Sequence, residues 1–260
     1  MDASVIGRLS GSLLDPPCLP LSSPNARPRE TGRVIELPFG AELRLATKQS
    51  AELGGGGDFF EVFDHGDGYV STVVADVCGN GAAAARIANR VRPLLHSSLA
   101  RGESPGRLLA ALNETLLTCG LLTRFVTAVA VRIDVLTGLV EIACAGHMGP
   151  FVRRASGQVR ALNGATGVPL GLVREETYDE ISLELDPDDA LILVTDGITD
   201  PLSTFCDPLG ESGLLRRLRA APHVTADICE ALLAAGTLVR DDATVLVMQM
   251  PARHATRVAA

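Results

Sequence analysis

Several residue types are scarce in this chain, and each scarcity narrows the class of protein. Tryptophan is absent and aromatic residues make up only 3% of the 260 residues, so aliphatic side chains must fill the core. Lys48 is the only lysine among 23 basic residues, and the net charge is −8. Nucleic-acid-binding surfaces need clustered basic residues, so this balance argues against a nucleic-acid partner. We interpret the preference for arginine as GC-rich codon usage, which indicates a bacterial source.

Cysteine pairs and long apolar segments are also missing. The six cysteines are scattered without a C-x-x-C pair, and residues 1–13 carry no continuous apolar run. We therefore expect free thiols, no signal peptide and no disulfide framework. No uncharged apolar stretch reaches the roughly 20 residues that span a bilayer. These absences predict a cytoplasmic protein with no membrane partner.

The first 40 residues differ in composition from the rest. They hold six of the 15 prolines and show no sustained hydrophobic period. This composition is typical of an extended or partly disordered N-terminal arm. From residue 41 the pattern becomes regular, which predicts one domain over residues 41–250 and a C-terminal tail over residues 251–260.

Alternating and continuous apolar runs predict strands, and turn sequences join many of them into hairpins. We expect strands at residues 42–48, 59–63, 69–75, 125–135, 139–144, 151–153, 159–162, 180–185, 190–194 and 243–250. Helices are expected at 81–99 with an interruption or kink near Pro93, from an N-cap at Ser104 to a stop at Gly120, and within 211–219 and 225–239. Hairpins dominate and helices arrive in pairs, which predicts an α+β fold with antiparallel sheets covered by helices.

Four aspartates, Asp58, Asp76, Asp196 and Asp241, each stand where an apolar run meets a glycine or a turn. Taken singly, each has an ordinary explanation, such as a flexible glycine loop or a solvated turn. If they converge in the fold, the carboxylates repel one another unless cations lie between them. Such oxygen ligands select magnesium, manganese or calcium, and two of these ions side by side can hydrolyse phosphate esters. The set predicts a metal-dependent phosphatase.

Seven short motifs then follow one another along the chain. They are Gly-Gly-Asp58-Phe-Phe, Ala-Asp76-Val-x-Gly-x-Gly, Phe125-Val-Thr127, Ala145-Gly-His147, Pro169-Leu-Gly171, Thr195-Asp-Gly197 and Asp241-Asp-Ala-Thr244. In this order they resemble the SpoIIE-like branch of the PPM (type 2C) metal-dependent serine/threonine protein phosphatases, over roughly residues 41–250. The resemblance implies a four-layer α-β-β-α sandwich of two antiparallel sheets flanked by helices.

The resemblance also implies roles for individual residues. Asp76 would bridge two Mn²⁺ or Mg²⁺ ions, and Asp196 and Asp241 would complete the shell of one of them. Asp58 and the backbone carbonyl of Val77 would serve the other ion, partly through waters. Asp76 and Asp196 are the implied catalytic residues, and a water activated between the ions would attack the phosphorus in line.

Other positions carry weaker expectations. Asp242 is not an expected ligand, because the family aspartate is the first of its pair. His147 could donate a proton to the leaving oxygen or hold its loop by a hydrogen bond, and the structural role is slightly favoured. Lys48 and Arg86 are weak candidates for contacting substrate phosphate, because no arginine matches the phosphate-clamping arginine of the animal enzymes.

Four further residues bear on the resemblance. Thr195 and Thr127 are expected to orient carboxylates or backbone rather than to react. Asn80 stands where this branch generally has histidine, and Phe60 where it often has tyrosine. Neither departure replaces an expected metal ligand, so activity should survive.

The function that the resemblance implies is hydrolysis of phosphoserine or phosphothreonine on an anti-sigma-factor antagonist. Dephosphorylation of such a protein frees a sigma factor through partner switching. One alternative is a catalytically inactive PPM-fold module used for binding or as a scaffold. Another is a different two-metal hydrolase, a nuclease or a small-molecule phosphatase, and the acidic charge disfavours the nuclease.

Overall fold

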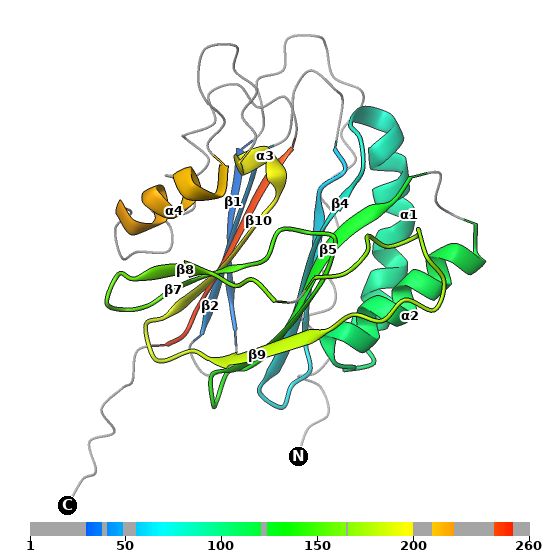
Figure 1. Ribbon diagram of the computed structural model, residues 1–260. Helices are drawn as coiled ribbons and strands as arrows, with labels where there is room; N and C mark the ends of the chain where they lie inside the picture. The colour runs from blue at the N-terminus through cyan, green and yellow to red at the C-terminus, as the bar shows by residue number, and fades with distance from the viewer. Residues whose placement is uncertain are drawn as a thin grey trace, which may run out of the picture.

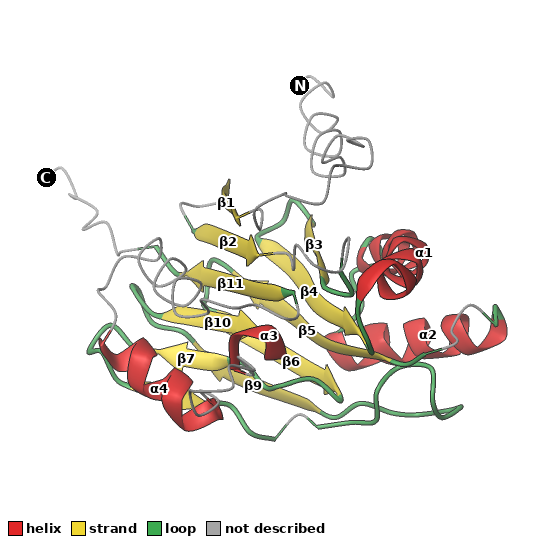
Figure 2. Cartoon of the chain, turned by 90° about the horizontal axis from the view of Figure 1, so that it is seen from above, coloured by secondary structure: helices red, strands yellow, loops and turns green. Residues whose placement is uncertain are grey.

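Two antiparallel sheets pack face to face between helices in this computed structural model (Figure 1). The structure describes residues 30–37, 41–48, 56–120, 124–164, 166–199, 210–220 and 242–251. Helices cover the outer face of each sheet, as the view from above shows (Figure 2). The predicted four-layer α-β-β-α sandwich is confirmed.

The first sheet has six strands in the order β1-β2-β11-β10-β7-β8. Every neighbouring pair in it is antiparallel. Its strands are β1 (Glu30–Glu36), β2 (Glu42–Lys48), β7 (Phe151–Arg153), β8 (Val159–Ala161), β10 (Ala190–Val194) and β11 (Ala243–Gln249). Strand β11, the last described strand along the chain, thus lies between β2 and β10.

The second sheet has five strands in the order β3-β4-β5-β6-β9, again all antiparallel. Its strands are β3 (Phe59–Asp64), β4 (Tyr69–Val77), β5 (Val126–Asp134), β6 (Leu139–Ala145) and β9 (Glu180–Glu184). Hairpins join β3 to β4 and β5 to β6, as the turn sequences predict, whereas two helices lie between β4 and β5 in the chain.

Helices α1 (Gly81–Leu99) and α2 (Pro105–Thr118) lie on the five-stranded sheet. The four-residue helix α3 (Asp196–Thr199) and helix α4 (Gly210–Ala220) lie on the six-stranded sheet. No helix among the described residues is long and apolar enough to cross a bilayer.

Strand β10 shows how aliphatic side chains fill the apolar layers on both faces of a sheet. All five of its residues are buried, but they alternate in direction. Leu191 and Leu193 join the core between the two sheets, whereas Ile192 and Val194 face α3 and α4. Both faces of this central strand are covered, so it is a continuous aliphatic run rather than an alternating one.

Residues 30–36, predicted to belong to the N-terminal arm, instead form strand β1 and pair with β2 from Glu30↔Lys48 to Glu36↔Glu42. The six-stranded sheet therefore includes a strand that begins before residue 41. Short β-branched runs such as this one become stable only when a neighbouring strand supplies the ladder. Residues 1–29 and 252–260 and the helix expected at 225–239 lie outside the described residues.

Two helices follow the expected bounds with one difference each. Helix α1 runs as one element from Gly81 to Leu99 and includes Pro93, so the predicted interruption is wrong. Ser104 is the N-cap residue of α2, as predicted, but its side chain makes no cap hydrogen bond to the helix. Its hydroxyl donates to Oε1 of Glu180 on β9 (2.5 Å), and the same oxygen accepts the backbone N–H of Gly106 (2.8 Å). A carboxylate from a distant strand thus accepts one of the free N–H groups at the N-terminus of α2.

Candidate active site

The ends of four strands meet at one end of the sandwich, the upper end in Figure 1. In the five-stranded sheet, Asp58 precedes β3 and Asp76 lies near the end of β4, with Phe59 opposite Ala75. In the six-stranded sheet, Val194 at the end of β10 lies opposite Val245 of β11. Thr195 and Asp196 follow β10 directly, and Asp242 directly precedes β11. Antiparallel pairing thus collects acidic residues that are far apart in the sequence.

Asp58 is held by two threonines from the opposite sheet. The hydroxyl groups of Thr195 and Thr244 each donate to Oδ2 of Asp58, both at 2.7 Å. The backbone N–H of Thr244 donates in turn to the hydroxyl oxygen of Thr195 (2.9 Å). We call Asp58, Thr195 and Thr244 the threonine clamp. It joins the two sheets at the carboxylate that sequence analysis assigns to a metal.

The surroundings of Asp58 disfavour its negative charge. Burial raises the pKa of the Asp58 carboxyl well above its usual range, and the charges of Asp76 and Asp242 raise the pKa further. The two threonine hydroxyls act in the opposite direction. A cation beside these carboxylates would offset both the burial and the repulsion.

The glycine run allows the chain to pass close to Asp76. A Cβ atom at Gly57 would lie 2.7 Å from Oδ1 of Asp76 and 2.7 Å from the carbonyl oxygen of Val77. The backbone N–H of Val77 donates to the carbonyl of Gly57 (3.2 Å). Two predicted oxygen ligands therefore lie around one glycine whose missing side chain leaves room for them, and this oxygen-rich set fits a hard divalent cation.

The Asp-Asp pair before β11 is only half described. Asp241, the predicted ligand, lies outside the described residues. Asp242 is buried, and its carboxylate packs so closely on Gly56 that a Cβ there would lie 0.9 Å from Oδ2. Its backbone carbonyl likewise leaves no room for a side chain at Gly197. Sequence analysis did not foresee this position for Asp242, because the partner glycines lie about 50 and 190 residues away in the chain.

Asp196 begins helix α3 and is exposed at the same end of the sandwich. Within the described ranges, no three acidic, histidine or cysteine side chains form a cluster that could hold a metal ion. The structure therefore brings Asp58, Asp76 and the carbonyl of Val77 together and leaves Asp196 at the rim. The complete ligand set remains a prediction.

His147 connects the two sheets beneath this site. Its Nε2 lies 3.2 Å from the carbonyl oxygen of Val194, and its Nδ1 lies 3.0 Å from the hydroxyl of Thr127. A carbonyl can only accept, so Nε2 carries the proton and Nδ1 accepts from Thr127. Burial lowers the pKa of His147 to about 4, so the ring is neutral near pH 7. This geometry fits the structural role rather than that of a proton donor.

Acidification should therefore destabilise the fold through His147. Between its unfolded pKa of 6.5 and its folded pKa of about 4, only the unfolded chain takes up the proton, so stability falls as the pH falls. The full effect at low pH is about 3 kcal/mol. In His147→Gln, which keeps an N–H donor and does not titrate, urea unfolding should change less between pH 7 and pH 5. Equal changes in both proteins would contradict this role.

The family model for stage II sporulation protein E (SpoIIE) matches residues 66–251, which is most of the chain. The chain belongs to the SpoIIE family. It carries the PPM-type phosphatase fold, as the resemblance predicts.

Two known proteins and one solved structure are similar to this SpoIIE-family domain. Protein IcfG of Synechocystis sp. is 26% identical over 225 residues, which is 74% of this chain and 35% of IcfG. Phosphoserine phosphatase RsbP of Bacillus subtilis is 26% identical over 159 residues, 60% of this chain and 39% of RsbP. The chain thus spans less than two fifths of each relative. The PP2C phosphatase domain of SpoIIE from Bacillus subtilis superposes with a TM-score of 0.68 at 22% identity, covering 86% of this chain and 65% of that one.

Three basic residues lie near this end of the SpoIIE-family domain. The backbone of Lys48 pairs with Ala243 at the start of β11. Arg86 is exposed on α1, within two turns of its N-terminus. Arg124 was not predicted, although it immediately precedes the Phe125-Val-Thr127 motif. It packs against Gly79, and its Nη1 donates to the carbonyl of Cys78 (3.0 Å), two residues after Asp76.

Proposed function

We propose that this chain is a metal-dependent protein phosphatase that hydrolyses phosphoserine or phosphothreonine on an anti-sigma-factor antagonist. The observation that carries the proposal is the meeting of Asp58 and Asp76, from the two ends of one hairpin, at a point where burial and mutual repulsion oppose their charges. Two buried threonines nevertheless donate hydrogen bonds that favour the ionised form of Asp58. Such a site is built for a bound cation.

The proposed cofactors are two Mn²⁺ or Mg²⁺ ions. Asp76 would bridge them, with Asp58 and the Val77 carbonyl on one side and Asp196 and Asp241 on the other. These are carboxylate and carbonyl oxygens, the ligand class that magnesium and manganese prefer. When bound, the ions would activate a water for attack on phosphorus and offset charge on the phosphoryl oxygens.

The protein's own residues would position the metal ligands and the phosphate. The threonine clamp fixes Oδ2 of Asp58, which leaves the carboxylate little rotational freedom. Helix α1 begins just after Asp76, so the free N–H groups of its first turn lie at the same end of the sheet, where they favour an anionic phosphate. Arg124, Lys48 and Arg86 are the candidates for contacting phosphate or protein around it. Beneath this site, His147 links the two sheets through its hydrogen bonds to Thr127 and to the carbonyl of Val194.

The substrate class rests on the relatives and on access. RsbP is named a phosphoserine phosphatase, and its matched region covers 60% of this chain. Asp196 lies exposed at the rim rather than in a deep pocket, and an open site can accept a phosphorylated side chain that is still attached to a folded protein. This supports a protein substrate over a small buried metabolite.

The first experiment is phosphate release from a phosphoserine-bearing antagonist protein and from a generic aryl phosphate, each with and without Mn²⁺. We expect turnover that requires the metal. If calorimetry shows Mn²⁺ binding while neither substrate is hydrolysed, the chain is instead the inactive binding or scaffold module. Metal-independent turnover would contradict the mechanism.

A further inference from the structure

Strand β8 is the last strand of the six-stranded sheet, so one side of its backbone faces no strand among the described residues. On its inner side, the carbonyl of Gln158 accepts the N–H of Arg154 (2.8 Å), and the N–H of Leu162 donates to Pro150 (2.8 Å). Antiparallel ladders alternate, so Val159 and Ala161 direct their N–H and C=O groups toward the open edge. An open edge of this kind is a template for another extended segment.

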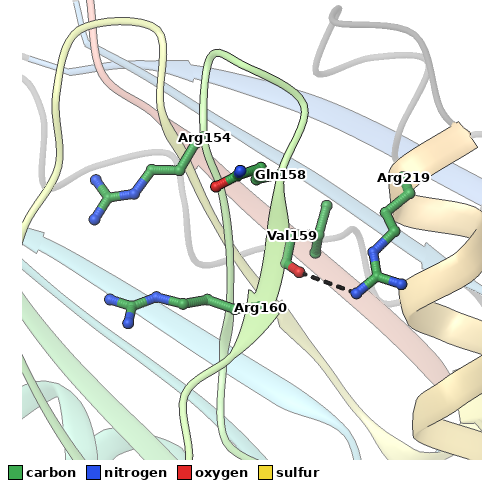
Figure 3. A pocket seen from close by; sticks show the side chains of 5 residues that line it. All are labelled: Arg154, Gln158, Val159, Arg160 and Arg219. Atoms are coloured by element: carbon green, nitrogen blue, oxygen red, sulfur yellow. Dashed lines mark hydrogen bonds between the residues drawn. The ribbon is translucent and has the colours of Figure 1, made fainter.

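A cavity of about 510 Å³ lies beside this edge and is basic in character (Figure 3). Its lining residues are Arg154, Gln158, Val159, Arg160 and Arg219. No carboxylate lines it, although the chain as a whole carries a charge of −8. The lining also contains no aromatic side chain on which a base could stack. The ligand chemistry that fits is therefore anionic and extended rather than flat.

The arginines differ in how fully they are paired. Arg154 is neutralised by the buried Asp189, with Nη1 2.5 Å from Oδ2. Arg219 reaches from α4 toward β8 and donates to the Val159 carbonyl at 3.5 Å, the outer limit for a hydrogen bond (Figure 3). Within the described part of the chain, neither Arg160 nor Arg219 has a carboxylate partner. Both can therefore bind carboxylates from outside.

We propose that the β8 edge and this cavity form a docking site for an extended acidic segment of a partner protein. The segment would add as a strand to Val159 and Ala161 while its carboxylates pair with Arg160 and Arg219. The site is distinct from the phosphatase site. Val159 pairs with Arg153, which pairs with Ala190 at the start of β10, whereas the acidic site follows the end of β10 at Val194.

The test measures binding of a fluorescent peptide of about ten residues built of Glu-Glu-Thr-Thr repeats, which places glutamates on both faces of the added strand and is long enough to pair along the edge. A matched control peptide carries glutamine in place of every glutamate. The full chain is used in metal-free buffer, so that peptide carboxylates cannot bind through a metal. We expect binding that weakens with salt. Arg160→Glu and Arg219→Glu should each weaken it about tenfold. Arg90→Glu, an exposed arginine on α1, is the matched control and should change nothing.

A second pair of variants tests the strand pairing itself. Ala161→Pro removes an N–H that points to the open edge and costs no ladder bond, so the sheet should persist while peptide binding is lost. Ala161→Val keeps the N–H and should bind normally. If Ala161→Pro does not fold, the arginine variants still decide the question.

Three results would overturn the proposal. The first is equal binding of the control peptide in which glutamine replaces every glutamate, and the second is full binding by both arginine variants. The third is pyrophosphate binding that depends on the same arginines, together with peptide binding that Ala161→Pro leaves unchanged. That result would make this a site for small anions. The assay needs no turnover, so its outcome is independent of the proposed phosphatase activity.

Discussion

Replacing Asp76 with asparagine is expected to lower metal-dependent phosphate release on the order of 10³-fold. Asparagine keeps the shape that fits beside Gly57, where a Cβ would lie 2.7 Å from Oδ1 of Asp76. It removes the charge that would bridge the two ions. The measurement is initial rate against Mn²⁺ concentration for the aryl phosphate and the phosphoserine protein.

The same variant should not lose stability without metal. Asp76 raises the pKa of Asp58 by repulsion, so neutralising Asp76 relieves a cost in the metal-free fold. We expect an unchanged or higher melting temperature in chelator. Asp188→Asn is the matched control: Asp188 is exposed, lies before β10 at the other end of the sandwich, and has a φ of 65°, which asparagine tolerates. Retained activity in Asp76→Asn, or its loss in both variants, would be incompatible with this assignment.

The sequence predicts well those parts of the fold that depend on the local spacing of apolar residues. Strands β2, β3, β4 and β10 follow from apolar residues that recur every second position or run without interruption, and the structure contains all four. The positions of Asp58 and Asp76 at strand ends follow from the same pattern, because a strand boundary fixes where a flanking carboxylate lies. The spacing of apolar residues does not show which strand ends lie together in the fold. That expectation comes from the resemblance to the SpoIIE-like phosphatases.

The parts that sequence does not predict depend on contacts between distant residues. Strand β1 lies in a proline-rich region, and only its pairing with β2 makes it a strand. Glu180 accepts the N–H of Gly106 in the first turn of α2 across 74 residues, and nothing in the local sequence of α2 indicates this. Asp242 reaches its buried position because Gly56 has no side chain. In each case the stabilising contact is with a residue far away in the sequence, which a local pattern cannot identify.

Removing the hydroxyl of Thr195 should damage both stability and metal binding. Thr195→Val keeps the side-chain shape but deletes the bond to Asp58 and the acceptor for the N–H of Thr244. Leaving the buried N–H of Thr244 unpaired and Asp58 with one hydrogen bond fewer costs about 2–3 kcal/mol of unfolding free energy. Because only Thr244 would then hold Asp58, its carboxylate would rotate more freely and Mn²⁺ affinity should fall roughly 10–100-fold. Urea unfolding and calorimetric titration with Mn²⁺ measure the two effects separately.

Two matched variants separate positioning from plain stability. Thr195→Ser restores the hydroxyl and should recover most of the Mn²⁺ affinity. Thr72→Val deletes another fully buried threonine hydroxyl, which donates to the carbonyl of Glu61 (2.9 Å) away from the acidic residues. It should lose comparable stability while binding Mn²⁺ normally. If Thr195→Val and Thr72→Val lose stability alike and both keep their metal affinity, the threonine clamp acts only as a tie between the sheets, and the orientation of Asp58 must come from elsewhere.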